Sequence, residues 1–289
     1  MDTRLEIPDA WSALDVSSWR GPILIFGASN SGKSTFARYL YARLLSTRRR
    51  VGYLDADVGQ SSLGPPTTIA IALHGGEDGR AFPPAGPRRI CFVGSNTPRW
   101  HIHTVILILY RMQLFAIQRQ AEAVVVDTSG LVDPLCGGAD LKWGKVELFR
   151  PCRVVAFQRE GELEPILAPL RHLPGVRLDE LPVADAVRSR PQEERRAYRA
   201  AGYRDYFRDA RRIPLPYDRL AVFPGPSFAP GQLVGLEGRD GFTLALGMVE
   251  RADEKMLWLR TPWSGRGKIT ALRLGDLRLD EHTFRESPV

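Results

Sequence analysis

The 289-residue sequence has little lysine, few cysteines and no long hydrophobic run. Only five of its 40 basic residues are lysine, a bias that genome composition alone can produce. The three cysteines, Cys91, Cys136 and Cys152, show no metal-ligand spacing, so we expect reduced, buried thiols. The longest apolar stretch, residues 105–110, is far shorter than the ~20 residues that span a bilayer. The first residues also lack a signal-peptide pattern, which predicts a cytoplasmic protein with no membrane partner.

What the sequence does contain is an ordinary globular composition with an uneven charge. Its 44% hydrophobic and 25% charged residues fit one large domain, or one large and one small domain. The net charge is +7, and most of the excess positive charge lies in residues 188–212, which contain nine arginines and four acidic residues. A basic protein suits a polyanionic partner, although composition by itself leaves that partner open.

Apolar runs rich in β-branched residues alternate with helical patterns along the first two thirds of the chain. This alternation predicts an α/β fold with a parallel sheet and helices on both faces. The expected strands are residues 22–26, 51–57, 89–94, 121–127 and 153–158, and the expected helices are residues 34–46, 102–120 and 162–173. Residues 74–89 have the composition of a loop. After about residue 212 the chain turns to short apolar runs split by Gly, Pro and Asp, with a hairpin turn at 237–241.

Residues 27–35, GASNSGKST, match the phosphate-binding loop G-x-x-x-x-G-K-[ST]. The strand before the loop and the helix after it are the context that makes this motif specific. Its glycines let backbone N–H groups converge on phosphate oxygens at the start of a helix. Lys33 is expected to reach the β- and γ-phosphates, and Ser34 to ligate Mg²⁺. The predicted nucleotide-binding residues are Gly27, Ala28, Ser29, Asn30, Ser31, Gly32, Lys33, Ser34 and Thr35.

Three carboxylates stand at or near the ends of predicted strands. Asp55 and Asp57 alternate along an extended segment, so both are expected on one face, with Asp57 nearer the end where ligands bind. Asp57 is a candidate general base or metal-shell residue, and Asp55 a weaker one; a turn cap is the alternative for either. Asp127 ends the pattern AVVVD, which is typical of the carboxylate that anchors Mg²⁺ through water. We expect Asp127 on the magnesium side and Asp57 on the acceptor side, with metal binding by both left open.

The arginine-rich segment is the next candidate for chemistry. Helical spacing places Arg195 and Arg199 four residues apart on one face. Phosphoryl transfer needs positive charge at the transferring group, which an arginine-bearing lid over about 185–212 would supply. The alternative is a solvated basic helix balanced by Glu193 and Glu194, and the preceding phosphate loop favours the lid.

Small polar residues end the strand in FVGSNTPRW, residues 92–100. Hydroxyl groups and backbone N–H groups at this position, including those of Ser95 and Thr97, suit the backbone phosphate of an acceptor strand. Trp100 has two interpretations, a ring that stacks on a base and a partly buried residue at the start of a helix. His101 and His103 are expected to be structural.

Taken together, these residues resemble the P-loop polynucleotide 5′-hydroxyl kinases of messenger-RNA 3′-end formation, tRNA splicing and ribosomal-RNA processing. The resemblance runs through GASNSGKST, DADVGQSSLGPP, GSNTP, DTSG, FQREGELEPIL and RSRPQEERRAYRAAGYRDYF. The tail is similar to the small C-terminal domain of the bacterial, archaeal and ribosomal-RNA-processing branch. We therefore expect a lead-in over residues 1–20, a P-loop kinase domain over 21–212 and a small β-rich domain over 213–289, the organisation of a minimal prokaryotic-type member.

The resemblance implies transfer of the γ-phosphate of ATP, or another NTP, with Mg²⁺, to the 5′-OH of single-stranded or duplex-end RNA or DNA. Asp57 matches the family's D-V-G-Q aspartate, the proposed base. The lid arginines map best onto Arg190 and Arg195, while Arg188, Arg196 and Arg199 stay open. The predicted nucleic-acid-binding residues are Gln60, Ser95, Thr97, Thr128 and Leu131. Many relatives carry Trp at the position of Leu131, where leucine offers bulk but no stacking face.

Two other functions compete with an active kinase. One is a catalytically weak, nucleotide-bound assembly factor in RNA processing, which is a related role in this family. The other is a GTPase-type switch, but the sequence has no clear guanine-reading N-K-x-D tetrapeptide. The intact Lys33, Ser34 and Asp57, together with the arginine-rich segment, favour the kinase.

Overall fold

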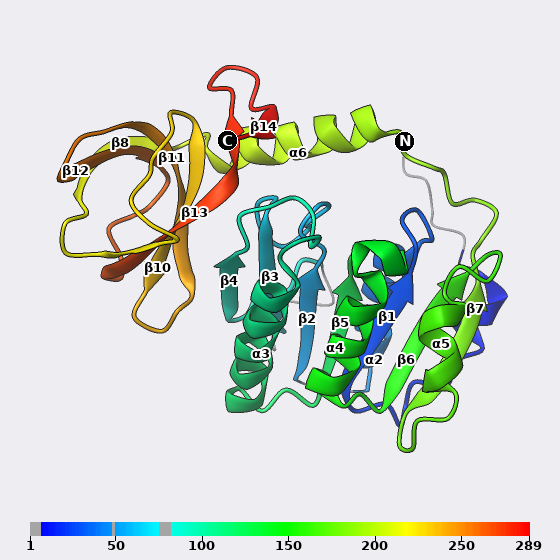
Figure 1. The fold of residues 1–289 in the computed structure, drawn as a ribbon. Coiled ribbons are helices and arrows are strands. Elements are labelled where there is room, and N and C mark those ends of the chain that lie inside the picture. Colours follow the sequence, from blue (N-terminus) through cyan, green and yellow to red (C-terminus); the bar gives the residue numbers. More distant parts are fainter. Residues whose placement is uncertain (1–6, 48–49, 75–81) are drawn as a thin grey trace. The chain divides into compact units, whose positions relative to one another are not determined.

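The computed structural model describes residues 7–47, 50–74 and 82–289, and it contains two sheets (Figure 1). The first sheet has the strand order β4-β3-β2-β5-β1-β6-β7. Its strands are β1 (Gly21–Gly27), β2 (Val51–Ala56), β3 (Thr68–Leu73), β4 (Arg88–Phe92), β5 (Ala123–Thr128), β6 (Arg153–Gln158) and β7 (Arg177–Pro182). Strand β1 lies between β5 and β6 and pairs in parallel with both, which places Ile25 beside Asp127 and Gly27 beside Phe157.

Helices connect these strands, as the alternating pattern predicts. They are α1 (Asp9–Ser12), α2 (Lys33–Leu45), α3 (Ile102–Gln118), η1 (Pro134–Cys136), α4 (Gly138–Phe149), α5 (Glu164–Leu170) and α6 (Gln192–Tyr206). Helices α4 and α5 lie on one face of the sheet and α2 on the other (Figure 1). The α/β fold class is therefore confirmed. Among residues 7–47, 50–74 and 82–289, no helix has both the length and the apolar character that crossing a membrane requires.

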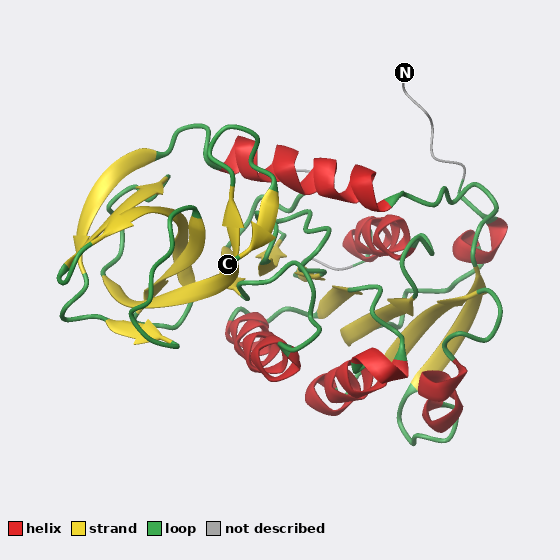
Figure 2. Ribbon diagram, turned by 45° about the horizontal axis from the view of Figure 1, so that its top comes forward, coloured by secondary structure: helices red, strands yellow, loops and turns green. Residues whose placement is uncertain are grey.

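The second sheet is formed by the last third of the chain (Figure 2). Its strands are β8 (Arg211–Pro216), β9 (Ala221–Phe223), β10 (Gln232–Gly238), β11 (Thr243–Ala252), β12 (Met256–Thr261), β13 (Ile269–Leu279) and β14 (Glu286–Pro288). Strands β10 and β11 pair in antiparallel fashion, so the hairpin turn expected at 237–241 is confirmed. Alternate residues of β10 to β13 form an apolar core that includes Val234, Leu257 and Leu272.

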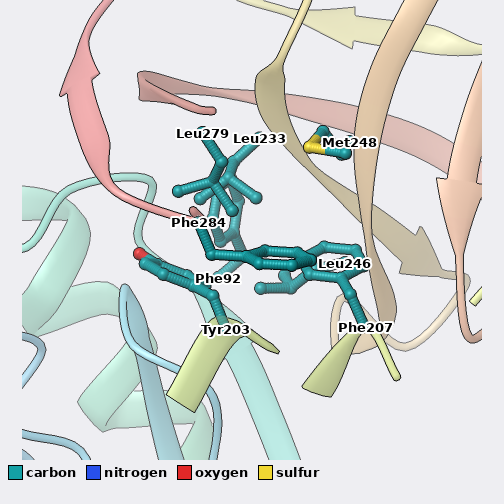
Figure 3. Close-up of a cluster of buried hydrophobic side chains, with 8 residues drawn as sticks. All are labelled: Phe92, Tyr203, Phe207, Leu233, Leu246, Met248, Leu279 and Phe284. Atoms are coloured by element: carbon teal, nitrogen blue, oxygen red, sulfur yellow. The ribbon is translucent and has the colours of Figure 1, made fainter. Parts of the chain in front are cut away.

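The chain divides into two compact units, which we call the P-loop unit and the second unit. The P-loop unit consists of Met1–Asp55, Ala72–Pro87 and Leu109–Ser189, and the second unit of Ala56–Ile71, Arg88–Ile108 and Arg190–Val289. A core of eight buried side chains joins β4, α6 and the second sheet within the second unit (Figure 3): Phe92, Tyr203, Phe207, Leu233, Leu246, Met248, Leu279 and Phe284. Helix α6 thus packs with the second sheet, and the predicted domain boundary near residue 212 stays a prediction.

The loop expected over residues 74–89 and the three cysteines only partly match the expectations from the sequence. Residues 82–87 of the predicted loop 74–89 are irregular, but residues 75–81 lie outside the described part and β4 begins at Arg88. The expectation of three buried thiols is wrong, because only Cys91 is buried, while Cys136 is half-buried and Cys152 exposed. Cys152 precedes β6, where the chain enters the sheet from a surface turn, and its thiol donates to the carbonyl of Arg20 at 2.7 Å.

Candidate active site

The phosphate loop links β1 to α2, and its glycines have the conformation that the motif requires. Gly32 is the N-cap of α2 with φ of 82°, a left-handed conformation that costs glycine little. A Cβ at Gly27 would overlap Ser31 Oγ and lie 3.0 Å from the carbonyl oxygen of Phe157. The loop is therefore drawn tightly between β1 and β6, with the N-terminus of α2 directed at the space where a phosphate would lie.

Lys33 lies in this loop and is buried, with 6% of its surface exposed. Its Nζ donates to the carbonyl of Ala28 at 2.5 Å and lies 3.4 Å from Ser31 Oγ. The ammonium group is thus held over the loop by the loop's own oxygens. This is a position from which it can move onto phosphate oxygens, because those oxygens offer a stronger, charge-assisted contact.

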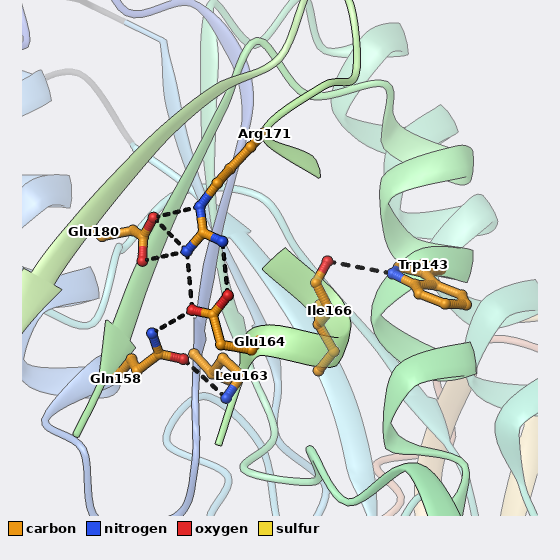
Figure 4. A network of polar contacts seen from close by, with 7 residues as sticks. All are labelled: Trp143, Gln158, Leu163, Glu164, Ile166, Arg171 and Glu180. Carbon is orange, nitrogen blue, oxygen red and sulfur yellow. Dashed lines mark hydrogen bonds and ion pairs between the residues drawn. The ribbon is translucent and has the colours of Figure 1, made fainter. Parts of the chain in front are cut away.

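A polar network behind the loop fixes the segment that follows β6 (Figure 4). Arg171 donates to both carboxylate oxygens of Glu164, at 2.7 and 2.9 Å, and to Glu180 on β7. Gln158 donates to Glu164 at 2.8 Å and accepts from the backbone N–H of Leu163. The hydrogen bonds from Arg171 and Gln158 lower the pKa of Glu164 to about 2.

The same segment reaches the phosphate loop through Arg159. Its guanidinium Nη2 donates to the carbonyl of Asn30 at 2.7 Å, and Asn30 Nδ2 donates to Ser189 Oγ at 3.4 Å. Gly32 also faces Val187, whose Cγ2 lies 3.2 Å from a built Cβ. The loop therefore contacts residues 187–189, the start of the predicted lid segment. Arg159, which anchors the loop, belongs to no motif with a predicted role. Its only sequence signal is that it lies in FQREGELEPIL, one of the segments that carry the family resemblance.

Asp127 and Asp55 are almost fully buried at the end of the P-loop unit's strands, each 1% exposed. Tyr53 on β2 donates its hydroxyl to Asp127 Oδ2 at 3.0 Å. Burial raises the pKa of the Tyr53 hydroxyl well above its usual value, and the charges of Asp127 and Asp55 add to the shift. Tyr53 therefore stays protonated and orients the Asp127 carboxylate. Sequence patterns predicted both carboxylates but missed this tyrosine.

The turn after β5 lies directly against the phosphate loop. A Cβ at Gly130 would come within 2.6 Å of the backbone nitrogen of Ser29, so only glycine fits there. Thr128 is fully buried; its hydroxyl donates to Ile25 at 2.6 Å and accepts from Lys142 at 2.8 Å. The prediction that Thr128 contacts nucleic acid is therefore not supported, since both capacities of its hydroxyl are used inside the protein. Leu131 is half-buried at the end of this turn.

Two buried lysines on α4 were not predicted as part of the site. Lys142 is 0% exposed, and its Nζ donates to the carbonyl of Ser129 at 2.6 Å as well as to Thr128. Lys145, one turn later in the helix, is also fully buried. Their helix lacks a strong amphipathic pattern, so no sequence signal marks either position as interior. Lys142 supports the turn that faces the phosphate loop.

Asp57 lies in the second unit, beyond the end of β2. Because it follows the strand, strand alternation does not set its direction, and the expectation that it shares a face with Asp55 has no support. Its Oδ1 accepts the backbone N–H groups of Gly59 and Gln60 at 3.0 and 3.1 Å. A Cβ at Gly59 would lie 2.8 Å from the carbonyl oxygen of Asn96. The Asp57 loop therefore packs directly on the loop that contains Ser95 and Thr97.

The loop of residues 94–101, which we call the acceptor loop, is internally hydrogen-bonded. Ser95 is buried and its hydroxyl accepts from the N–H of Thr97 at 3.4 Å, while Thr97 is half-buried. Gln60, half-buried in the adjacent Asp57 loop, donates through Nε2 to the carbonyl of Gly59 at 3.0 Å. Ser95 thus shapes the loop, and Thr97 and Gln60 have more of their surface at solvent.

Helix α6 contacts the Asp57 loop and carries the predicted lid arginines. Tyr198 donates its hydroxyl to the carbonyl of Ser61 at 3.1 Å. Arg199 is buried and forms an ion pair with Glu286 of β14, with Nε to Oε1 at 2.8 Å. Glu286 Oε1 also accepts from Asn96 Nδ2 at 3.3 Å. Glu286 therefore ties α6 and the acceptor loop to the last strand, a link that no local sequence pattern indicates.

The remaining lid arginines differ in their surroundings. Arg195 is half-buried, and its Nε has no hydrogen-bond partner within residues 7–47, 50–74 and 82–289. Arg190 is exposed, with Nε 3.8 Å from Glu194. Arg188 and Arg196 are exposed as well. An arginine with a buried nitrogen that lacks a protein partner is suited to an anionic ligand, whereas Arg199 is already paired.

The residues of the P-loop unit fit a nucleotide with a magnesium ion. No cluster of three or more His, Cys, Asp or Glu side chains able to hold a metal occurs in the described part of the chain. Mg²⁺ does not need a cluster of three side chains, since it is usually bound by one or two carboxylates together with substrate phosphates. Ser34 is half-buried at the start of α2, and Ser129 Oγ is buried without a hydrogen-bond partner among the described residues.

Comparison with known proteins agrees with this geometry. Residues 27–209 match the family described as mRNA cleavage and polyadenylation factor CLP1 P-loop. The chain belongs to this family. Family membership implies nucleotide binding at the phosphate loop, with ATP the nucleotide expected.

Two archaeal relatives and one solved structure extend the comparison. The chain is 32% identical to a polyribonucleotide 5′-hydroxyl-kinase of Methanocaldococcus jannaschii, over 75% of this chain and 60% of the relative. It is 34% identical to one of Thermococcus kodakarensis, over 72% of this chain and 58% of the relative. The chain thus spans about 60% of the length of these relatives. A structure of the wild-type Clp1p–Pcf11p complex shares the fold, with a TM-score of 0.68 at 16% identity over 91% of this chain and 76% of that one.

Proposed function

We propose that this chain transfers the γ-phosphate of ATP to the 5′-hydroxyl end of a polynucleotide. The observation that carries the proposal is that one chain holds both a phosphate loop with a buried lysine and an Asp57-containing loop that packs, through Gly59, on the acceptor loop. The phosphate loop suits a donor nucleotide, and the Asp57 loop suits an acceptor hydroxyl. The archaeal relatives are named polyribonucleotide 5′-hydroxyl-kinases, which supports RNA as the acceptor.

In the proposed reaction the 5′-hydroxyl oxygen bonds to the γ-phosphorus while the bond from that phosphorus to the β–γ bridging oxygen breaks. Asp57 takes the hydroxyl proton, and ADP leaves. Two backbone N–H groups donate to Asp57 Oδ1 and hold this carboxylate in its loop. Lys33 neutralises charge on the β- and γ-phosphates. Arg195 supplies positive charge to the transferring group, with Arg190 as a second, more exposed candidate.

Two carboxylates and two hydroxyls complete the assignment on the donor side. Ser34 and, through water, Asp127 would hold Mg²⁺, which when bound offsets charge on the phosphate oxygens. Tyr53 keeps Asp127 oriented, and Asp55 adds negative charge nearby. On the acceptor side, Gln60, Thr97 and Leu131 are the proposed contacts, with Ser95 shaping the loop. Thr128 and Arg199 are positioning residues in this proposal.

The test is transfer of labelled γ-phosphate to matched RNA and DNA oligonucleotides that begin with a 5′-hydroxyl. Label on the oligonucleotide establishes the kinase and its preferred acceptor together, and the same oligonucleotide with a 5′-phosphate should stay unlabelled. Retained ATP binding with no transfer to either acceptor would contradict the kinase and favour the nucleotide-bound assembly factor.

A further inference from the structure

Trp100 in the acceptor loop is the most exposed aromatic residue among the exposed large hydrophobic side chains, with 84% of its surface at solvent. The interpretation of Trp100 as a partly buried residue at a helix start is therefore wrong. Tryptophan is usually well buried, because its indole ring carries a large apolar surface. An indole left in water next to a candidate binding loop needs another reason.

The backbone at Trp100 is also unusual. Its φ is 69°, in the left-handed region that non-glycine residues seldom occupy. Glycine, or asparagine, would adopt this conformation at lower cost. The chain therefore carries a bulky ring at a position where backbone geometry favours a small residue, and the ring gains almost no burial in return.

Hydrogen bonds on either side of Trp100 hold the backbone of the acceptor loop. The N–H of Arg99 donates to Thr97 Oγ1 at 3.3 Å, and the N–H of His101 donates to the carbonyl of Pro98 at 2.9 Å. His101 Nε2 lies 2.6 Å from Asp276 Oδ2 on β13. The N–H of Asp276 in turn donates to the carbonyl of Gly94 at 2.9 Å. Trp100 thus lies on a loop that is hydrogen-bonded at both ends to Asp276 of the second sheet.

Arg99 lies against the indole, with its guanidinium carbon 4.9 Å from the ring centroid. This cation–π contact occupies one side of the ring, and the high exposure leaves the rest open. A planar π-system next to a positive charge matches a nucleotide, because the ring can stack on a base while the guanidinium faces a phosphate. The guanidinium of Arg99 gives the ring a charged neighbour, unlike the apolar surroundings of a protein-docking core.

We infer that Trp100, backed by Arg99, is a stacking platform for a base of the acceptor strand near its 5′-hydroxyl end. The inference rests on the proposed function for the identity of the strand. The platform lies within the same loop as Thr97, three residues away, so a strand contacted by Thr97 needs only one or a few nucleotides to reach it. Leu131 offers no stacking face, and Trp100 would supply one from a different element.

The test is equilibrium binding of a 3′-labelled RNA with a 5′-hydroxyl to the full chain, followed by fluorescence anisotropy. A series of RNAs carries a single abasic site at each of the positions nearest the 5′ end. We expect one abasic position to weaken binding to the wild type roughly 5- to 100-fold, the range of one aromatic–base stack. Trp100→Ala should bind the intact RNA equally weakly and should no longer distinguish it from that abasic RNA.

Three further variants separate stacking from structure. Trp100→Phe should keep most of the affinity, because it keeps a π-face. Trp100→Gly should lose as much affinity as Trp100→Ala while melting at the same or a higher temperature than the wild type, since glycine fits the left-handed backbone. Tyr110→Ala, which removes another exposed aromatic ring on α3, should bind both RNAs as the wild type does.

Several results would overturn the inference. One is that Trp100→Ala binds RNA as tightly as the wild type does, as expected of a ring that contacts a protein partner instead. Another is that Trp100→Ala still binds the intact RNA more tightly than the abasic RNA. A large drop in melting temperature for both Trp100→Ala and Trp100→Gly would make the ring structural. Phosphate transfer, measured on the same samples, tests the proposed function separately: a wild type that binds RNA without phosphorylating it contradicts the kinase, while the binding series still decides the platform.

Discussion

The P-loop unit and the second unit hold their functional groups in different ways. In the P-loop unit Lys33, Asp55 and Asp127 are all buried; Tyr53 orients Asp127, and Arg159 anchors the phosphate loop through Asn30. In the second unit the groups proposed to meet the acceptor are half-buried or exposed on loops, and buried residues behind them, such as Glu286, do the fixing. This contrast suits one ligand of constant shape, a nucleotide triphosphate, and another of variable sequence, a polynucleotide end.

The largest expected effect comes from removing Lys33, the lysine of the phosphate loop. Lys33→Ala should reduce transfer roughly 100- to 1,000-fold or more, because charge on the β- and γ-phosphates is left without its main cation. Binding of a 5′-hydroxyl RNA, measured in the absence of ATP, should stay unchanged. Lys255→Ala, an exposed lysine beside β12, is the matched control and should transfer as the wild type does. Near-normal turnover of Lys33→Ala would remove the phosphate loop from the mechanism.

On the acceptor side, Asp57→Asn should lower the transfer rate at saturating substrates by roughly 100- to 10,000-fold, the range of a lost general base. Asparagine keeps a carbonyl oxygen that can accept the N–H groups of Gly59 and Gln60, so the loop and the melting temperature should stay intact. A titration with Mg²⁺ separates the two roles left open for Asp57. If Asp57 acts only as base, the Mg²⁺ concentration for half-maximal rate does not move; an increase would assign Asp57 to the metal instead.

Two arginines on helix α6, Arg195 and Arg199, are expected to respond differently to substitution. Arg195→Ala should reduce the transfer rate with little change in ATP affinity or melting temperature, because the charge is needed in the transition state. Arg199→Ala should instead destabilise the protein by about 3 kcal/mol, since it leaves buried Glu286 without its cation. Thermal unfolding and steady-state kinetics on both variants test this, with Arg204→Ala, an exposed arginine of the same helix, as control. A destabilised Arg195→Ala, or a stable Arg199→Ala, would reverse the assignment.

The smallest expected effect concerns pH and the network behind the phosphate loop. Because the pKa of Glu164 falls from a usual 4.5 to about 2 in the folded chain, its ion pair with Arg171 stabilises the fold above about pH 4.5. That contribution should be lost as the pH falls from about 4.5 towards 2. Glu164→Gln should therefore melt at a lower temperature than the wild type at neutral pH, and the gap should close in acid. A gap that does not change with pH would show that packing, not charge, is what the substitution removes.

Sequence reasoning was most successful where local chemistry repeats in a fixed order. The phosphate loop, the strands before Asp57 and Asp127 and the arginine-rich helix could all be predicted, because each combines a periodic apolar pattern with polar residues at a strand or helix end. Strand β7, with the polar sequence RLDELP, was missed because its burial is partial and its pattern weak. Helix α4 was missed because it buries two lysines, which reverses the usual relation between charge and exposure.

The sequence by itself determined that this chain binds phosphate and that it alternates strands with helices, because backbone geometry and side-chain period act over a few residues. Only the tertiary structure decided what each polar side chain does. It pairs Thr128 and Arg199 with other groups of the protein, joins Asn96 and Arg199 through Glu286, and leaves Trp100 in water. The physical reason is that burial and pairing depend on residues distant in the chain, such as Arg199 and Glu286, which are 87 positions apart and which no local pattern connects.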